Sequence, residues 1–253
     1  MVKLILKRTT IFFASLVTFM IHLPFAFANS KPVIKISLPM IKYTANMKAV
    51  ILNKSSSNMS IYEDLKLNSL GMSSDAFKFA IQGFENLKMA GRIFKDDILT
   101  IVDFTKPSSE KRLFIIDMKN RKILFNTYVA HGQKSGAGMA TTFSNTPESF
   151  QSSLGFYETT GTYIGKNGYS MRLDGLENGI NDKAEERAIV MHGAPYVSEG
   201  FIKARGYLGR SWGCPAVPEN LNRPIIDRIK NGSCLFIYSN DKTYIKKSKV
   251  INS

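Results

Sequence analysis

Histidine and cysteine are both scarce in this sequence, which has three histidines and two cysteines among its 253 residues. Zinc sites draw most of their ligands from clustered cysteine and histidine, so this small set argues against a metal site. The sequence also has no internal repeat, no coiled-coil pattern and no glycine-rich phosphate-binding loop. These absences exclude repeat proteins and P-loop nucleotide-binding proteins. We expect neither a metal nor another cofactor.

Acidic side chains are outnumbered, with 20 Asp and Glu against 34 Lys and Arg, and the formal net charge is +14. This balance favours an anionic partner, which can be a nucleic acid, a lipid surface or an acidic cell-wall polymer. Charge alone does not choose among them. The apolar content of 44% is enough for one sizeable core, so one main domain is expected.

The N-terminus has the pattern of a secretory signal peptide, residues 1–28. Three basic residues precede an uncharged apolar run from Ile11 to Phe27, which closes with the small-residue pattern Ala26-Phe27-Ala28. The alternative is an uncleaved membrane anchor. It is less favoured because Pro24 interrupts a run that is short for a spanning helix. The mature protein is therefore predicted to begin at Asn29.

Export narrows the choice of partner. Cleavage removes Lys3, Lys7 and Arg8, so three of the fourteen net positive charges are lost and the mature chain keeps +11. Outside the cytoplasm no nucleic-acid partner is expected, whereas an anionic cell-wall polymer is. We predict a protein of the periplasm or cell envelope, with no stable membrane span after the signal is removed.

The chain after the signal peptide divides into a lead-in with two helices (29–96), a catalytic domain (97–240) and a basic, solvated tail (241–253). A capping box at Ser60 to Glu63 predicts the first helix, with Gly71 as its stop. The second helix runs from Ser74 to Gly91. Its predicted buried face is Phe77, Ile81, Phe84 and Leu87.

Alternation of apolar and polar residues replaces the helical pattern after Asp97 and predicts a mainly β sandwich or barrel with short helices, preceded by the small helical N-terminal segment. A hairpin turn is expected at residues 119–121, loops at 131–147, an acidic insertion at 174–186 and a helix over Glu219 to Lys230. The predicted strands are 98–104, 112–118, 122–130, 152–161, 163–173, 187–192 and 234–239.

The two cysteines occupy different environments. Cys234 lies in an apolar strand pattern, where a cysteine usually behaves as a small buried hydrophobe. Cys214 lies among glycine and proline in a loop that follows His192 at the end of a predicted strand. An imidazole that takes the thiol proton turns a weak nucleophile into a reactive one, and N–H groups around Gly213 and Cys214 can face an oxyanion. This pattern predicts acyl transfer through a thioester. A Cys214–Cys234 disulfide remains the alternative, since the sequence does not determine the Cα separation.

The residues around this pair carry a resemblance. His192-Gly193 followed by Ser211-x-Gly213-Cys214 resembles the signature of the L,D-transpeptidase family of murein enzymes. The longer run from Arg187 to Val217 is similar to the murein L,D-transpeptidase catalytic-domain-like subfamily. The resemblance extends back through 143–147 and 154–157, and covers roughly Ile98 to Ser239.

The resemblance implies a mainly β domain with the cysteine and histidine in one cleft, acting on peptidoglycan stem peptides after the L-centre of their third residue. By position, Cys214 is the nucleophile, His192 its base and later its acid, and Gly193 the residue whose carbonyl orients the imidazole. Ser211, Trp212 and Gly213 form the nucleophile and oxyanion loop. Candidate substrate-binding residues are His131, Tyr196 and Arg210. For His131 the alternative is a strand-end histidine that is bonded to nearby backbone.

Two positions depart from the family pattern, because Trp212 replaces a common histidine and Ala216 replaces a common Asn or Arg. These departures leave the acceptor open: it can be a second stem peptide, a lipoprotein or water. Water as the acceptor would make the protein an L,D-carboxypeptidase or endopeptidase. The competing hypothesis of another class is a catalytically idle, basic envelope-binding protein that keeps the fold.

Overall fold

The computed structural model describes residues 60–253. The predicted signal peptide and the lead-in up to residue 59 lie outside the described residues, so those expectations stay predictions. No helix among residues 60–253 combines the length and apolar character that crossing a membrane requires.

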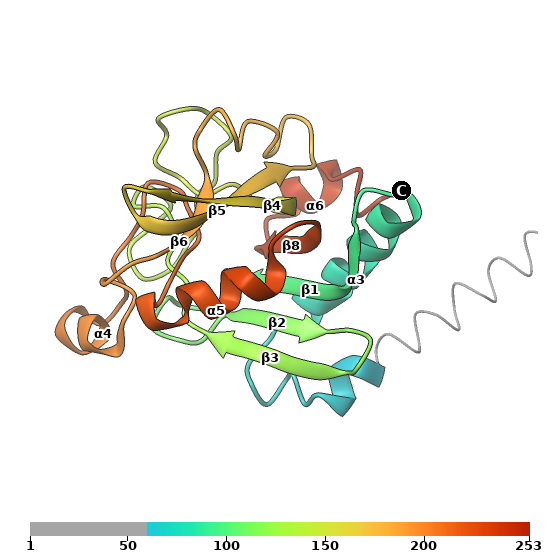
Figure 1. The fold of residues 1–253 in the computed structure, drawn as a ribbon, viewed down its shortest axis with the longest axis horizontal. Helices are drawn as coiled ribbons and strands as arrows, with labels where there is room; N and C mark the ends of the chain where they lie inside the picture. Colours follow the sequence, from blue (N-terminus) through green and yellow to red (C-terminus); the bar gives the residue numbers. More distant parts are fainter. Residues whose placement is uncertain (1–59) are drawn as a thin grey trace, which may run out of the picture. The chain divides into compact units, whose positions relative to one another are not determined.

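Eight strands form one mixed sheet within the described part of the chain, in the order β3-β2-β1-β8-β4-β5-β6-β7 (Figure 1). Neighbouring strands are antiparallel except for the parallel pairs β1–β8 and β6–β7. The strands are β1 Lys95–Asp103, β2 Leu113–Asp117, β3 Lys122–Thr127, β4 Gly155–Gly165, β5 Gly168–Gly175, β6 Val190–Gly193, β7 Ala216–Val217 and β8 Ser233–Tyr238. The mainly β prediction is confirmed.

The two edges of this sheet approach each other, so the sheet is nearly closed like a barrel. The chain beyond β3 forms an isolated bridge between Ala130 and Ala216 of β7, the opposite edge strand. Closure removes exposed strand edges, which otherwise invite aggregation. A small apolar cluster lies at this junction, formed by Ala130, Ala194, Val197, Leu208 and Ala216.

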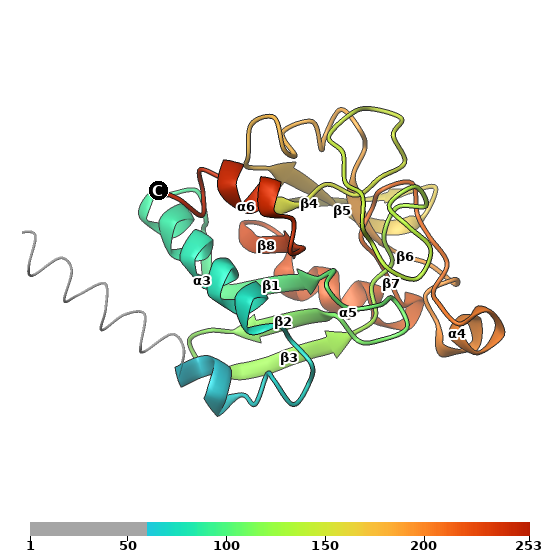
Figure 2. The same cartoon turned by 180° about the vertical axis from the view of Figure 1, so that it is seen from behind.

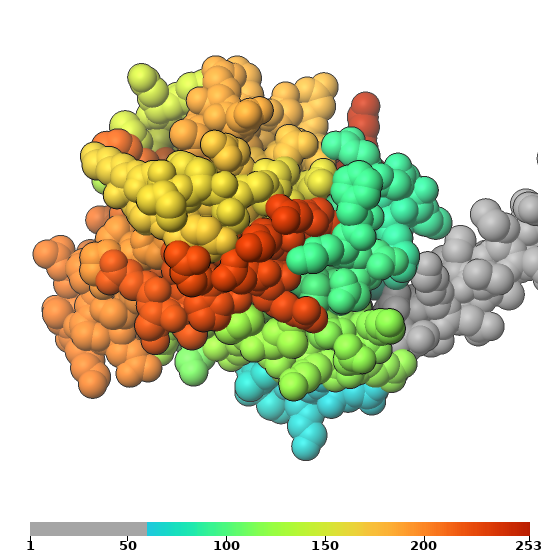
Figure 3. All heavy atoms as spheres, viewed as in Figure 1, coloured from blue at the N-terminus to red at the C-terminus, as the bar shows by residue number. Residues whose placement is uncertain are grey.

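Helices cover the sheet at several places. Helix α3 (Ser74–Met89) contacts β1 and β8, and α5 (Glu219–Ile229) contacts β5 and β6. Helix α5 lies in front of the strands in Figure 1 and behind them in Figure 2. In Figure 3 its red-orange atoms lie between the yellow β4–β5 hairpin and the green β2–β3 hairpin. A short helix, α4 (Glu199–Arg205), was not predicted; it has no buried residue.

Helix α3 confirms the sequence pattern. Ser73 accepts a hydrogen bond from the Ala76 N–H at its start, and Gly91, with φ +66°, follows its end. The predicted apolar face is buried, namely Phe77, Ile81, Phe84 and Leu87. Because these side chains join the same core as the sheet, the predicted boundary at residue 97 does not separate two packing units.

The first predicted helix is shorter than expected, since only residues 60–64 of the described chain are helical before a series of turns. Lys66 adopts φ +49°, and the N–H groups of Lys66 and Leu67 bond to the carbonyls of Glu63 and Tyr62. This is a Schellman ending with a lysine at the left-handed position. The sequence predicts that Gly71 ends this helix, but Gly71 closes the turn that follows it.

Strand boundaries differ from the prediction at several places, among them the β4–β5 turn and the start of β6. The sequence predicts that one strand ends at residue 161 and the next begins at residue 163. In the structure β4 instead continues to Gly165, and the turn lies at Lys166-Asn167. The strand expected over residues 187–192 begins only at Val190, since Ala188 has φ +50°, which no strand accommodates.

The C-terminal tail is not solvated as predicted. It contains α6 (Lys242–Lys247), and Tyr244, Ser248 and Ile251 are buried. The hydroxyls of Tyr244 and Ser248 donate hydrogen bonds to the buried carboxylate of Glu177. The tail therefore completes the core, which its basic composition concealed.

Candidate active site

Strand β6 and the parallel strand β7 bring the two predicted catalytic residues to one edge of the sheet. His192 is paired with Ala216 of β7 on one side and with Ser170 of β5 on the other. Cys214 precedes Ala216 by two residues, so the nucleophile loop runs directly into the strand beside His192. Two segments separated by about twenty residues thus meet through strand pairing.

The His192 ring is held in one tautomer. Its Nδ1 lies 2.9 Å from the Gly193 carbonyl oxygen, which can only accept, so Nδ1 carries the proton. The lone pair is therefore on Nε2, for which the structure shows no hydrogen bond with another described residue. Burial lowers the pKa of His192, against a smaller rise from the bond to Gly193. The ring is neutral at neutral pH, as a general base requires.

The Cys214 thiol lies against the backbone at the start of β6. The Val190 N–H is 3.5 Å from Sγ, and the Ala188 carbonyl oxygen is 3.7 Å from it. Burial raises the pKa of the Cys214 thiol, although the Val190 N–H and the positive charge of Arg187 lower it. Cys234 is a separate, fully buried thiol in β8, and both cysteines are free. The disulfide alternative is absent from the structure.

The nucleophile loop is braced by Ser211. Its hydroxyl donates to the Cys214 carbonyl oxygen at 2.6 Å and accepts from the Gly213 N–H at 3.1 Å. Gly213 has φ +125°, and a Cβ there would lie 2.8 Å from the Gln151 carbonyl oxygen. Only glycine adopts this conformation in this space. The Gly213 N–H is bonded to Ser211, whereas the Cys214 N–H makes no hydrogen bond with another residue in the described part of the chain.

A second loop, residues 144–153, supports the nucleophile loop through hydrogen bonds. The Ser152 hydroxyl donates to the Gly213 carbonyl oxygen at 3.1 Å and accepts from the Gly132 N–H. The half-buried Arg187 guanidinium donates to the Ser144 carbonyl oxygen at 2.7 Å and to the Ser149 hydroxyl at 3.2 Å. The sequence search missed Arg187 and Ser152, although Arg187 opens the motif run.

Trp212 does not pack beneath the loop. Its side chain is 69% exposed and meets the Phe150 ring edge-on, with ring centroids 5.5 Å apart. Lys134 lies over the other ring of this pair, 5.2 Å from the Phe150 centroid. The Trp212 side chain therefore does not contribute to the hydrophobic core.

The three candidate substrate-binding residues have different environments in the structure. His131 is fully buried; its Nδ1 accepts from Arg112 at 2.8 Å and its Nε2 faces the Gly136 carbonyl oxygen at 3.2 Å. Burial and the Arg112 charge lower its pKa to about 4. Neither ring nitrogen is left for a substrate, so the proposed contact is replaced by an internal role.

Arg210 donates to the Gly136 carbonyl oxygen at 3.1 Å. Burial, with a smaller contribution from Cys214, raises the pKa of Tyr196 to about 12.

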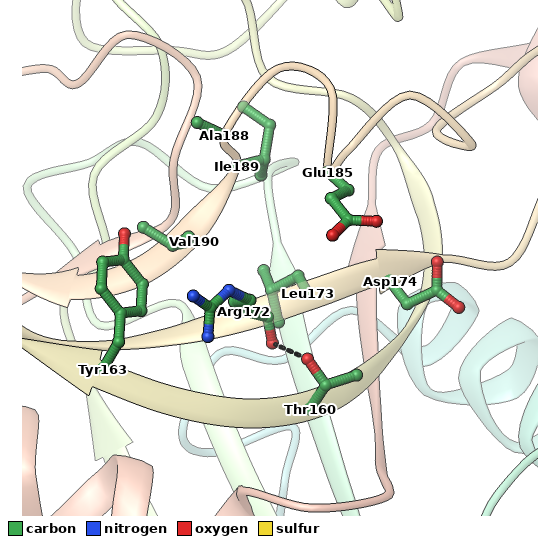
Figure 4. A pocket seen from close by; sticks show the side chains of 9 residues that line it. All are labelled: Thr160, Tyr163, Arg172, Leu173, Asp174, Glu185, Ala188, Ile189 and Val190. Carbon is green, nitrogen blue, oxygen red and sulfur yellow. Dashed lines mark hydrogen bonds between the residues drawn. The ribbon is translucent and has the colours of Figure 1, made fainter.

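A pocket of about 500 Å³ is lined by β4, β5 and the segment that leads into β6 (Figure 4). It shares Ala188 and Val190 with the surroundings of Cys214. Sequence reasoning did not find this pocket, because its residues come from three distant segments and form no motif. The lining residues are Thr160, Tyr163, Arg172, Leu173, Asp174, Glu185, Ala188, Ile189 and Val190.

A family model described as "L,D-transpeptidase catalytic domain" matches residues 68–238, more than half of the chain. The match begins earlier than the resemblance traced from motifs and includes α3. No curated protein matches the sequence.

Several solved structures are distantly similar. An L,D-transpeptidase from Mycobacterium smegmatis is 12% identical with a TM-score of 0.36, over 56% of this chain and 59% of that one. The helical cell shape determining protein Pgp2 from Campylobacter jejuni is 15% identical with a TM-score of 0.39, over 64% and 57%. An L,D-transpeptidase from Stackebrandtia nassauensis is 15% identical with a TM-score of 0.34, over 67% and 69%. The chain spans less than two thirds of the first two proteins.

Proposed function

Because this chain belongs to the family of L,D-transpeptidase catalytic domains, we propose that it is an enzyme that transfers acyl groups of peptidoglycan stem peptides through a thioester on Cys214. The observation that carries the proposal is the pairing of β6 with β7. Through this pairing the Cys214 loop lies beside a strand whose histidine is neutral and whose Nε2 makes no hydrogen bond with another described residue. A base next to a nucleophile, itself oriented by a third group, is the arrangement that covalent catalysis needs.

The reaction begins with His192 Nε2 taking the Cys214 proton as the sulfur attacks the donor carbonyl. A tetrahedral oxyanion forms, and the Cys214 N–H is the loop donor available to it. The intermediate collapses to a thioester, the C–N bond breaks, and His192 returns its proton to the leaving amine. An acceptor amine then attacks the thioester and His192 takes the proton of that amine. The C–S bond breaks, and His192 returns the proton to sulfur, which regenerates the thiol.

Both groups rest in their neutral forms, because burial raises the pKa of Cys214 and lowers the pKa of His192. Proton transfer therefore accompanies attack, rather than a preformed thiolate–imidazolium pair waiting for substrate. The Val190 N–H and the positive charge of Arg187 stabilise the negative charge that develops on sulfur.

The acceptor is proposed to be an amine in preference to water. A thioester is more reactive toward amines than an oxygen ester is, and a bound acceptor has a high effective concentration. The exposed Trp212 of the nucleophile loop and the half-buried Phe150 that it contacts are available to shield the thioester from solvent. Transfer to a second stem peptide, rather than to a lipoprotein, is the simplest form of this proposal.

Purified muropeptides test the proposal. A tetrapeptide donor is incubated with and without a second amine-bearing stem peptide, and products are weighed by mass spectrometry, with Cys214→Ser as the inactive control. Dimer that forms only with acceptor supports transfer. Loss of the terminal residue at the same rate in both tubes indicates a carboxypeptidase.

The idle envelope-binding protein is distinguished by thiol alkylation. Cys214 is partly exposed, and Cys234 is fully buried in β8. An enzyme shows alkylation of Cys214 that falls when His192 is replaced by alanine, whereas an idle fold shows no dependence on His192. The predicted location in the periplasm or envelope, with an anionic wall polymer as partner of the basic surface, belongs to the same proposal.

A further inference from the structure

An aromatic surface lies on the nucleophile loop and on the segments beside it. Trp212 is 69% exposed and meets the half-buried Phe150 at an interplanar angle of 62°. Because the two rings do not stack on each other, most of the indole stays accessible to a ligand. The Lys134 ammonium lies 5.2 Å from the Phe150 ring centroid. Together, Lys134, Phe150 and Trp212 form an aromatic platform.

The three side chains of the aromatic platform come from three chain segments that backbone hydrogen bonds join. The Gln133 N–H donates to the Ser211 carbonyl oxygen at 2.8 Å. The next N–H, that of Lys134, donates to the Phe150 carbonyl oxygen at 3.1 Å. Phe150 has φ +55°, a left-handed conformation that a phenylalanine keeps only where its surroundings hold it. The backbone beneath the platform is therefore fixed before a ligand binds, which lowers the entropic cost of binding.

The size and the surroundings of the aromatic platform select the class of ligand. Two aromatic side chains offer at most about 500 Å², less than the roughly 800 Å² that each partner buries in a stable protein interface. The side chains of Gln133, Lys134 and Arg210 are exposed in the same segments and are polar. A sugar ring stacks its flat C–H face on an aromatic ring, while its hydroxyl and amide groups bond to polar neighbours. A sugar therefore uses both properties of this surface.

The aromatic platform is close to the nucleophile. Trp212 precedes Cys214 by two residues, so their Cα atoms are within about 7 Å of each other. In peptidoglycan the first residue of each stem peptide is joined to a sugar of the glycan strand. When the carbonyl of the third residue lies at Cys214, three extended residues place that sugar about 10 Å away. A sugar at this distance is within reach of the indole.

We propose that the aromatic platform binds the sugar to which the donor stem peptide is attached. The Trp212 indole stacks on the sugar ring, and the Lys134 ammonium donates a hydrogen bond to a hydroxyl or acetamido oxygen of the same sugar. This inference rests on the proposed function, because it takes the substrate to be a stem peptide of peptidoglycan. It adds that the enzyme recognises the peptide together with its glycan and prefers this form to a free peptide.

Fluorescence tests the stacking contact, because the chain contains a single tryptophan and its emission reports on Trp212 alone. Cys214→Ser protein is titrated with a disaccharide-tetrapeptide muropeptide and with the same tetrapeptide without sugar. The muropeptide should shift the emission to shorter wavelength as the indole leaves water, and the free tetrapeptide should not. A single-stranded DNA oligonucleotide, which also stacks on aromatic rings, should leave the emission unchanged. No shift with the muropeptide, or an equal shift with the free tetrapeptide or the oligonucleotide, overturns the inference.

Calorimetry in the same Cys214→Ser background assigns the contact. The muropeptide should bind at least about ten-fold more tightly than the free tetrapeptide. Trp212→Ala should remove this difference without changing the affinity for the free tetrapeptide, and Trp212→Phe, which keeps a ring, should retain part of it. Phe94→Ala is the matched control, because Phe94 is 77% exposed and lies beside Gly232, outside the platform. It should change neither affinity.

The remaining outcomes separate this inference from the proposed function. A preference for the muropeptide that survives Trp212→Ala overturns the inference. Selective binding of the muropeptide that depends on Trp212, without product in the muropeptide assay, supports the inference and overturns the proposed function alone.

Discussion

At the scale of single residues, the chemistry depends on how the backbone surrounds two side chains. The Gly193 carbonyl selects the His192 tautomer, and the N–H of Val190 faces the Cys214 sulfur. Neither interaction requires a particular neighbouring side chain. The sequence motif identifies His192, Cys214 and Gly193, but the Val190 N–H that faces the sulfur is found only in the structure.

Removal of either side chain should abolish turnover while the protein stays folded. Cys214→Ser and His192→Ala should each lower kcat/KM by roughly 10³-fold or more, because both groups take part in the same transition state. Cys234→Ser should keep activity and lose about 1–3 kcal/mol of unfolding free energy, since it places a hydroxyl in a fully buried position. Steady-state kinetics and urea unfolding check these outcomes. Activity in Cys214→Ser together with inactivity in Cys234→Ser would show that the nucleophile was assigned to the wrong thiol.

The pH dependence of the reaction follows from the lowered pKa of His192. The imidazole accepts a proton only above its pKa, so the acid limb of kcat/KM should lie below the ordinary histidine value of about 6.5. A rate profile over the acidic range measures the limb. Circular dichroism must accompany it, because the buried neutral His131, with a pKa of about 4, makes the fold lose stability as the pH falls below the unfolded value. An acid limb above 6.5 in folded protein contradicts the assignment.

At the scale of elements, the site is the meeting point of β6, the nucleophile loop and the loop at residues 144–153. The parallel pairing of β6 and β7 sets the distance between the base strand and the cysteine loop. Ser152 and Arg187 then attach the supporting loop to both. Local sequence predicts each element separately, and their contact depends on closure of the sheet.

The conformation of Gly213 should control activity more than stability. Gly213→Ala places a methyl group 2.8 Å from the Gln151 carbonyl oxygen at φ +125°, so the cysteine must shift. A shift of about 1 Å should cost about 10²-fold in kcat/KM. Gly206→Ala is the matched control, because Gly206 also has a positive φ, +80°, but no atom lies within 4 Å of its added Cβ. Kinetics and thermal unfolding of both variants check this. Equal activity losses in the two would assign the effect to backbone strain alone.

At the scale of the described domain, the C-terminal segment is part of the core. Glu177 is 4% exposed and accepts hydrogen bonds from the Phe156 N–H, the Tyr244 hydroxyl and the Ser248 hydroxyl. Gln82 and Asn86 of α3 donate to the carbonyls of Ile251 and Val250. One buried carboxylate and one helix thus hold the end of the chain against the sheet.

Glu177→Ala should therefore release the C-terminal segment. Three buried donors lose their acceptor, which should cost about 2–4 kcal/mol of unfolding free energy. Urea denaturation measures the loss, and limited proteolysis should show cleavage within residues 242–253 before the rest of the domain. The exposed Glu186→Ala is the control. Unchanged proteolysis of Glu177→Ala would mean that apolar burial of Tyr244 and Ile251 alone holds the segment.

The sequence by itself determined the family signature, the mainly β class, the buried face of α3 and the hairpin at residues 119–121, because these features are local patterns of side-chain type. It misplaced the end of the first helix, the β4–β5 turn and the start of β6. At the end of the first helix and before the start of β6, the non-glycine residues Lys66 and Ala188 adopt left-handed conformations, which residue type alone does not predict.

Tertiary structure alone decided the internal role of His131, the docking of the tail and the existence of the charged pocket. Each depends on groups that are separated in the chain. Arg112 bonds to His131, Ser248 bonds to Glu177, and Arg172 and Glu185 line the same pocket. Whether such a group is buried depends on its desolvation cost and on hydrogen bonds with distant residues. A short stretch of sequence determines neither of these.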